Sequence, residues 1–180
     1  MNGTTPGRQP LIHFHSPFVW LVIAGLVIIL DLYTKQWAVD TLILYRPVEV
    51  LPWLNWLLAH NYGAAFSFLS DAGGWQRWFF TVLAIVVSLV LLVWLFRLRE
   101  GEWRTGLALG LVIGGAVGNL LDRLTLGYVI DFIDVHYRGL HWPAFNVADS
   151  AISCGIALLL LDALIETLRR PGDAARDDGE

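Results

Sequence analysis

Charged residues are scarce in this sequence, and cysteine is almost absent. Asp, Glu, Lys and Arg make up 16% of the 180 residues, whereas 56% are hydrophobic and the mean hydropathy is +0.58. In ordinary soluble domains about a quarter of the residues are charged. The low charged fraction and high hydrophobic fraction here are therefore typical of membrane proteins. With a formal net charge of −4 and no basic stripe, the sequence gives no indication of nucleic-acid binding.

The one cysteine, Cys154, excludes an intrachain disulfide and a cysteine-rich metal site. We interpret it as a small apolar residue inside a helix. The sequence also lacks the H-E-x-x-H pattern of zinc metallopeptidases and the G-x-S-x-G pattern of serine hydrolases. No two of His60, His136 and His141 have the i, i+4 spacing of a helical zinc site. We therefore expect neither a metal nor a cofactor.

Four uncharged runs indicate membrane-spanning helices, at residues 17–30, 78–96, 105–121 and 150–161. A helix needs about 20 residues to cross the hydrocarbon core of a bilayer. The first run has 14 residues and the fourth has 12, so each must extend past a charged residue. The first extends forward through "DLYTKQWAV", which puts Asp31 inside the membrane. The fourth extends backward through "FNVAD", which puts Asp149 about one turn inside.

The predicted fold class is an all-α membrane protein with four transmembrane helices and a small extracytoplasmic segment, partly β or interfacial, between helices 1 and 2. The stretch "LPWLNWLLA" at 51–59 is aromatic and apolar but too short to span, which favours a place at the outer surface. The predicted domains are a cytoplasmic tail at 1–16, one four-helix transmembrane domain at 17–166 and a disordered cytoplasmic tail at 167–180.

The arginines predict the orientation of the helices. The loop "RLREGEWR" at 97–104 holds three arginines and two more follow the last span, whereas arginines are sparse in the connections 39–74 and 122–143. This is a positive-inside pattern with both termini cytoplasmic. A cleaved signal peptide at the first span is disfavoured because no A-x-A-like site precedes Asp40. The predicted topology gathers five acids near the outer leaflet: Asp31, Asp122, Asp131, Asp134 and Asp149.

Ionisable residues inside a bilayer usually mark function, but two pairs here also have a structural interpretation. Asp31 and Lys35 are spaced i, i+4 and could simply neutralise one another on one helix face. Asp122 and Arg123 could be interfacial anchors at the end of a helix. The residues alone leave both interpretations open.

Structural interpretations also apply to later residues. Asn146 and Asp149 have the spacing of a capping box at the start of a helix. Asp134 fits the surrounding apolar pattern poorly and is interpreted as a solvated loop acid. The glycines of the third span recur at i, i+4 intervals and predict a face for close helix packing. These glycines are Gly106, Gly110, Gly114 and Gly118.

Two carboxylates that face one cavity cannot both ionise easily, and they share a proton. The ionised member can take a proton from water while the protonated one hydrogen-bonds the scissile carbonyl. The residues therefore predict an aspartate-dyad hydrolase. A transporter subunit that relays protons would stagger Asp31, Asp122 and Asp149 through the bilayer instead. A lipid-modifying transferase would need a metal or phosphate site, and no such motif is recognisable.

Five sequence blocks resemble the lipoprotein signal peptidases, also called signal peptidase II. They are "DLYTK" from Asp31, "NYGAAFSFL" from Asn61, "GNLLDR" from Gly118, "GYVIDF" with Asp131 and "FNVADSAI" with Asp149. Each block is weak by itself, but all five in this order are highly specific. The likeness runs from about residue 18 to 166. Leu32 departs from the pattern, since glutamine is common at that position in the family.

The resemblance implies a bacterial inner-membrane aspartyl peptidase that cuts prolipoproteins just before a cysteine carrying diacylglyceryl. It implies that Asp131 and Asp149 are catalytic. The expected partners are such prolipoproteins and membrane lipid, with a monomeric enzyme, an active site near the outer leaflet and no metal or cofactor. Implied substrate-binding residues are Asn61, Asn119, Arg123 and Asn146. Implied supporting residues are Asp31, Lys35, Gly63, Asp122 and Ala148.

Overall fold

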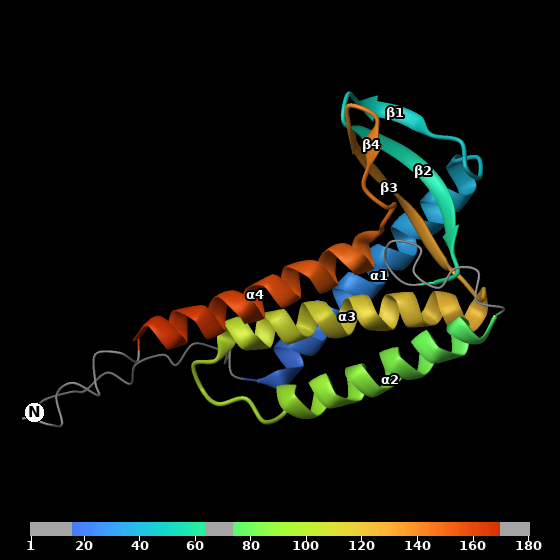
Figure 1. Ribbon diagram of the computed structural model, residues 1–180. Coiled ribbons are helices and arrows are strands. Elements are labelled where there is room, and N and C mark those ends of the chain that lie inside the picture. Colours follow the sequence, from blue (N-terminus) through green and yellow to red (C-terminus); the bar gives the residue numbers. More distant parts are fainter. Residues whose placement is uncertain (1–15, 64–73, 170–180) are drawn as a thin grey trace, which may run out of the picture.

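The computed structural model describes residues 16–63 and 74–169, and within these ranges the chain forms four long helices with a small sheet at one end of them (Figure 1). The helices are α1 (Pro17–Thr41), α2 (Trp75–Leu95), α3 (Trp103–Thr125) and α4 (Val147–Arg169). Each is long and apolar enough to cross a membrane, which confirms the predicted spans. The predicted tails lie almost wholly outside the described residues.

The two short spans extend as the length argument predicts. Helix α1 runs without a break through Asp31 and Lys35, and α4 begins at Val147, so that Asp149 lies in its first turn. Large apolar side chains on the outside of the helices, such as Phe18 and Leu160, are two-thirds exposed. Exposed apolar side chains suit contact with lipid tails. The helical backbone suits the same environment, because its N–H and C=O groups hydrogen-bond within the helix and need no water.

The sheet is antiparallel and has the strand order β1-β2-β3-β4. Strands β1 (Val48–Leu51) and β2 (Leu54–Asn61) lie between α1 and α2, where the fold-class prediction placed a partly β segment. Strands β3 (Val129–Tyr137) and β4 (Leu140–His141) lie between α3 and α4 and were not predicted. The first four residues of β3 are all buried, so the alternation that usually marks a strand is missing there.

Helix α3 lies in the middle of the bundle and contacts the other three helices (Figure 1). Its glycine face packs closely against another helix, as predicted, and the structure identifies that helix as α1. A Cβ atom on Gly110 would lie 2.8 Å from the carbonyl oxygen of Trp20, and one on Gly114 would lie 2.8 Å from that of Ala24. Glycine at these positions therefore lets the two backbones approach closely. This approach brings the polar residues of α1 against α3.

Candidate active site

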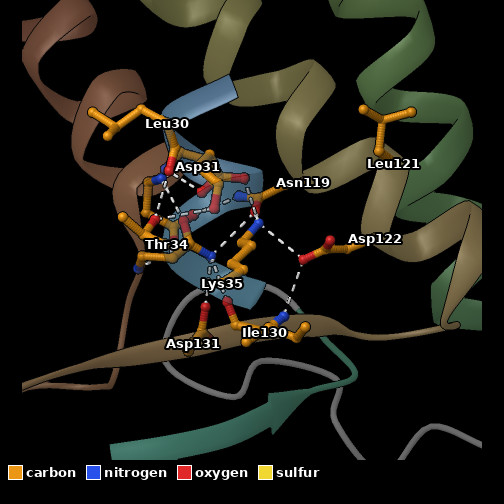
Figure 2. Close-up of polar contacts among 12 residues, drawn as sticks. Leu30, Asp31, Thr34, Lys35, Asn119, Leu121, Asp122, Ile130 and Asp131 are labelled. Carbon is orange, nitrogen blue, oxygen red and sulfur yellow. Dashed lines mark hydrogen bonds and ion pairs between the residues drawn. The ribbon is translucent and has the colours of Figure 1, made fainter. Parts of the chain in front are cut away.

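The predicted site residues converge where the sheet meets the ends of the helices. Asp131 comes from β3, Asp149 from the first turn of α4, Asn119 from α3 and Lys35 from α1. Figure 2 shows the α1 and α3 side chains pointing toward one another above the strand that carries Asp131. Segments far apart in the sequence thus form one polar cluster at one end of the bundle.

Asp131 is only 2% exposed, and both of its carboxylate oxygens accept hydrogen bonds. Oδ1 accepts from Asn146 Nδ2 at 2.8 Å, and Oδ2 accepts from Asn61 Nδ2 at 3.0 Å. Burial, reinforced by the nearby charge of Asp149, raises the pKa of Asp131 from 3.8 to about 7. Asp131 can therefore either keep or release a proton near neutral pH.

Asp149 is held by two neighbours. Its Oδ1 accepts from Asn119 Nδ2 at 2.8 Å, and its Oδ2 accepts from the backbone N–H of Asn146 at 3.3 Å. In return, Asn146 Oδ1 accepts the backbone N–H of Asp149 at 2.9 Å, which confirms the predicted capping box. The cap does not exclude a second role, because Asn146 Nδ2 remains free to bond Asp131. Asn146 is fully buried and links the two aspartates.

Lys35 is buried among two carboxylates and an amide (Figure 2). Its Nζ lies 2.7 Å from Asp31 Oδ2, 2.9 Å from Asp122 Oδ2 and 2.9 Å from Asn119 Oδ1. The predicted neutralisation of Asp31 by Lys35 is therefore confirmed, but it involves Asp122 as well. The interpretation of Asp122 as an interfacial anchor is wrong, because the residue is 4% exposed and faces Lys35.

The remaining predicted residues support this cluster. Arg123 is half-buried and donates through Nη2 to the carbonyl oxygen of Gly63 at 3.0 Å. The N–H of Gly63 donates to Asn61 Oδ1 at 3.0 Å, so Gly63 connects Arg123 to the asparagine that binds Asp131. The N–H of Ala148 donates to Asp31 Oδ1 at 2.9 Å. Residues 64–69 of the "NYGAAFSFL" block lie outside the described residues.

A cavity of about 540 Å³ opens beside this cluster. The predicted residues Asn61, Asn119, Arg123 and Asp149 line it. Asp131 is joined to it through the hydrogen bond from Asn61. A mainly apolar cavity with a few converging polar groups is the usual form of a binding site. The rest of the wall comes from Val129, from residues 142–145 and from the α4 side chains Ser150, Ile152, Ser153 and Cys154.

The interpretation of Asp134 as a solvated loop acid is wrong. Asp134 is 2% exposed and accepts a hydrogen bond from Asn55 Nδ2 at 2.8 Å. His141 Nδ1 lies 2.8 Å from its Oδ1. Asn55 of β2 is paired directly with Asp134 of β3, which brings their side chains together on one face of the sheet. Such pairing is decided by strand register, which the sequence analysis did not have.

Sequence reasoning also missed Arg77, the residue that holds the end of α3. Its Nε donates to the carbonyl oxygen of Arg123 at 2.8 Å, and its Nη2 donates to that of Leu124 at 3.0 Å. The only signal in the sequence was a basic residue at the end of a span.

In the described ranges, 16–63 and 74–169, no three His, Cys, Asp or Glu residues are grouped as metal ligands would be.

Comparison with known proteins gives concordant results. Residues 23–165 match the family model described as Signal peptidase (SPase) II. The lipoprotein signal peptidase of Acinetobacter baumannii is 55% identical over 154 residues, which cover 85% of this chain and 87% of the relative. That of Teredinibacter turnerae is 53% identical over 156 residues, covering 86% and 93%. A solved structure of a bacterial membrane enzyme superimposes with a TM-score of 0.78 at 31% identity, covering 86% and 93% of the two chains.

Proposed function

Since this chain belongs to the signal peptidase II family, we propose that it removes the signal peptide of diacylglyceryl-modified prolipoproteins by using Asp131 and Asp149 as a catalytic pair. Membership of the family makes the chain an intramembrane aspartic peptidase, and its four apolar helices make it a multi-pass protein of the bacterial inner membrane. The observation that carries the catalytic assignment is that Asn146 binds both aspartates beside a cavity.

The proposed reaction uses one proton shared by the two carboxyl groups, which titrate as a pair. The ionised carboxylate takes a proton from a water molecule, whose oxygen attacks the scissile carbonyl carbon. The protonated carboxyl group hydrogen-bonds the carbonyl oxygen as negative charge develops there. When the tetrahedral intermediate collapses, the leaving amine takes a proton and the shared proton is restored to the pair. The raised pKa of Asp131, about 7, supports proton sharing at neutral pH.

Polar groups around the cavity suit an extended peptide. Amides of asparagine both donate and accept, so Asn61 and Asn119 can hold a peptide backbone where water is scarce. Arg123 contributes a rigid, planar donor. The apolar part of the wall, from Phe145 and Ile152, suits the hydrophobic end of a signal peptide. All of these groups belong to one chain, so we propose that the enzyme acts as a monomer.

The position of the site along the helices fits a lipid-anchored substrate. Acyl chains on the modified cysteine stay in the bilayer, so the bond to be cut lies at a membrane surface. The site lies at the end of the helices that carries the sheet, and the arginine-rich loop between α2 and α3 lies at the other end (Figure 1). By the positive-inside rule we place that loop and both termini in the cytoplasm and the site near the outer leaflet.

Thiol labelling of intact spheroplasts tests this orientation. In a Cys154→Ala background, we expect a membrane-impermeant maleimide to label Arg138→Cys, in the exposed turn between β3 and β4. Glu100→Cys, in the exposed loop between α2 and α3, should be labelled only after the membrane is permeabilised. The reverse pattern would invert the proposed topology.

Cleavage of a diacylglyceryl-modified prolipoprotein peptide in detergent tests the reaction and its catalytic residues. We expect Asp131→Asn and Asp149→Asn to fold and bind the peptide but to lose turnover by at least about 100-fold, because asparagine cannot share the proton. Asp40→Asn removes an exposed acid near the end of α1 and serves as the matched control. Near-normal turnover in either site variant would move the assignment to Asp122 or Asp31. Failure of the wild-type enzyme to cut the peptide would overturn the function itself.

A further inference from the structure

Lys35 has more contacts than the neutralisation of one buried acid requires. We propose that Lys35 is a positioning residue for the reaction, acting through Asn119, Asp31 and Asp122 to fix the relative placement of the two catalytic aspartates. The inference rests on the proposed function, because it takes Asp131 and Asp149 as the reacting groups. Among the described residues, Lys35 does not line the cavity, and its ammonium group binds Asn119, Asp31 and Asp122 rather than either catalytic aspartate.

The two carboxylates bound by Lys35 also hold the backbone next to each catalytic residue. Asp31 Oδ1 accepts the N–H of Ala148 at 2.9 Å. Asp122 Oδ2 accepts the N–H of Ile130 at 3.1 Å (Figure 2). Ala148 directly precedes Asp149, and Ile130 directly precedes Asp131. One ammonium group therefore ties together the two carboxylates that anchor α4 and β3 at their catalytic positions.

A second link runs through the amide of Asn119. A lysine ammonium has only donors, so the amide must turn its oxygen toward Lys35. This orientation directs Nδ2 toward Asp149 Oδ1, 2.8 Å away. A flipped amide would place a donor against the ammonium and an acceptor against the carboxylate. Lys35 thus determines that Asp149 receives a hydrogen bond at this oxygen.

The same amide oxygen also orients Asn146. Asn146 Nδ2 lies 3.2 Å from Asn119 Oδ1 and 2.8 Å from Asp131 Oδ1. With its NH₂ group held on that side, Asn146 presents its own oxygen to the N–H of Asp149. The hydrogen-bond directions at both aspartates therefore follow from the position of the Lys35 ammonium group.

A purely structural role for Lys35 makes different predictions. A buried lysine needs one carboxylate for charge balance, and Asp31 at 2.7 Å already supplies it. Asp122 gives Lys35 a second carboxylate, 2.9 Å away, which the charge of one lysine does not require. A structural ion pair would affect stability when removed. A positioning group would also lower kcat and change the pH profile of kcat while substrate binding is kept.

The direction of the pH effect follows from the charges around Asp131. Asp149 raises the pKa of Asp131, whereas the positive charge of Lys35 lowers it. Arg123, a second cation near the pair, is held by the carbonyl oxygens of Gly63 and Asn119 and not by Lys35, so we expect its charge to remain when Lys35 is replaced. Loss of Lys35 therefore raises the pKa of Asp131, and the acid limb of the kcat profile should move to higher pH.

Replacement of Lys35 by methionine, which has a similar shape and no charge, is the direct test. In the peptide-cleavage assay we expect Lys35→Met to lower kcat by about 100-fold, the order found when reacting groups are slightly misplaced. We expect KM to change by less than about threefold, since binding that is equal in the ground and transition states is preserved. We expect the acid limb to shift upward.

Asp162→Asn is the matched control. Asp162 lies at the other end of the bundle, where Arg104 and Thr105 bind it at 3.4 and 2.9 Å. Its replacement also removes a polar contact between α3 and α4, and we expect a lower thermal stability with an unchanged kcat and pH profile. A double-mutant cycle with Asn119→Ala tests the link itself. We expect the losses in kcat to be strongly non-additive because the two residues act in one chain of contacts.

Lys35→Gln covers the case in which Lys35→Met does not fold. Glutamine can still donate to Asn119 Oδ1 but carries no charge, so we expect a kcat between those of wild type and Lys35→Met, with the same upward shift of the acid limb. Wild-type kcat and pH profile in a folded Lys35 variant, with a lower melting temperature only, would overturn the proposal. In that outcome the wild type still cleaves the peptide, so the proposed function would stand.

Discussion

Asn146 and Asp149 hydrogen-bond each other twice at the start of α4. The side chain of Asn146 accepts the N–H of Asp149 at 2.9 Å, and the side chain of Asp149 accepts the N–H of Asn146 at 3.3 Å. This reciprocal cap satisfies backbone donors that the first turn of a helix leaves unpaired. The same Asn146 side chain uses its NH₂ group on Asp131 at 2.8 Å. Its oxygen therefore serves the helix and its nitrogen serves the site.

Two replacements of Asn146 separate these roles. Asn146→Ser keeps an oxygen that can cap the N–H of Asp149, but its side chain is too short to reach Asp131. Asn146→Ala loses both contacts. We expect kcat to fall to a similar low level in both variants, whereas the alanine variant should be less stable by about 1 kcal/mol, the usual value of a cap. Peptide cleavage and thermal unfolding in detergent measure the two effects. Near-normal kcat in Asn146→Ser would show that the nitrogen is dispensable.

The close contact of α1 with α3 gives a second prediction. A Cβ on Gly114 would lie 2.8 Å from both the carbonyl oxygen of Ala24 and Cβ of Val27, so Gly114→Ala must push the helices apart. We expect it to cost about 1–3 kcal/mol of stability, the usual cost of overpacking. It should also lower kcat, because α1 carries Lys35 and α3 carries its partner Asn119.

Gly25→Ala is the matched control for this prediction. Gly25 lies in the middle of α1, and a Cβ there would meet nothing within 4 Å. Alanine is the better helix former, so we expect this variant to be as stable as the wild type or slightly more so. Melting temperatures and kcat are measured side by side for both variants. Equal values for Gly114→Ala and Gly25→Ala would mean that the helices are not held in close contact.

The helices could be predicted from the sequence because the bilayer fixes their length. Runs of 14 and 12 uncharged residues are too short to cross, so Asp31 and Asp149 had to lie inside the spans, and they do. Strand β3 could not be predicted in this way. Its first four residues are buried without interruption, and they give neither the period of a helix nor the alternation of a half-exposed strand.

Some contacts within the site could be predicted from the sequence and others could not. Local ones, such as Lys35 with Asp31 or Asn146 with Asp149, follow from i, i+4 and capping-box spacing. The contact of Lys35 with Asp122 joins residues of different helices, and no local pattern indicates it. The hydrogen bond between Asn55 and Asp134 depends on the register of β2 and β3. The interpretation of Asp134 as a solvated loop acid was therefore wrong, and so was the interfacial interpretation of Asp122 that the residues had left open, because both acids are buried.

The ionisation of Asp131 gives a prediction about stability as well as activity. Burial above all, and then the charge of Asp149, raise its pKa from 3.8 to about 7 in the folded enzyme. Between these two values the folded state keeps a proton that the unfolded state has lost. The stabilising contribution of Asp131 is therefore complete below pH 3.8 and is lost as the pH rises through 7.

Asp131→Asn removes this titration, so its stability relative to the wild type should rise with pH. Each pKa unit corresponds to about 1.4 kcal/mol, so from pH 5 to pH 8 we expect a relative gain of about 2–3 kcal/mol in the inactive variant. Thermal unfolding in detergent at several pH values measures it. Asp40→Asn, which changes an exposed acid, is expected to follow the wild-type curve throughout. A constant difference between Asp131→Asn and wild type across this range would show that Asp131 is already ionised at pH 5, and would remove the support that its raised pKa gives to a shared proton.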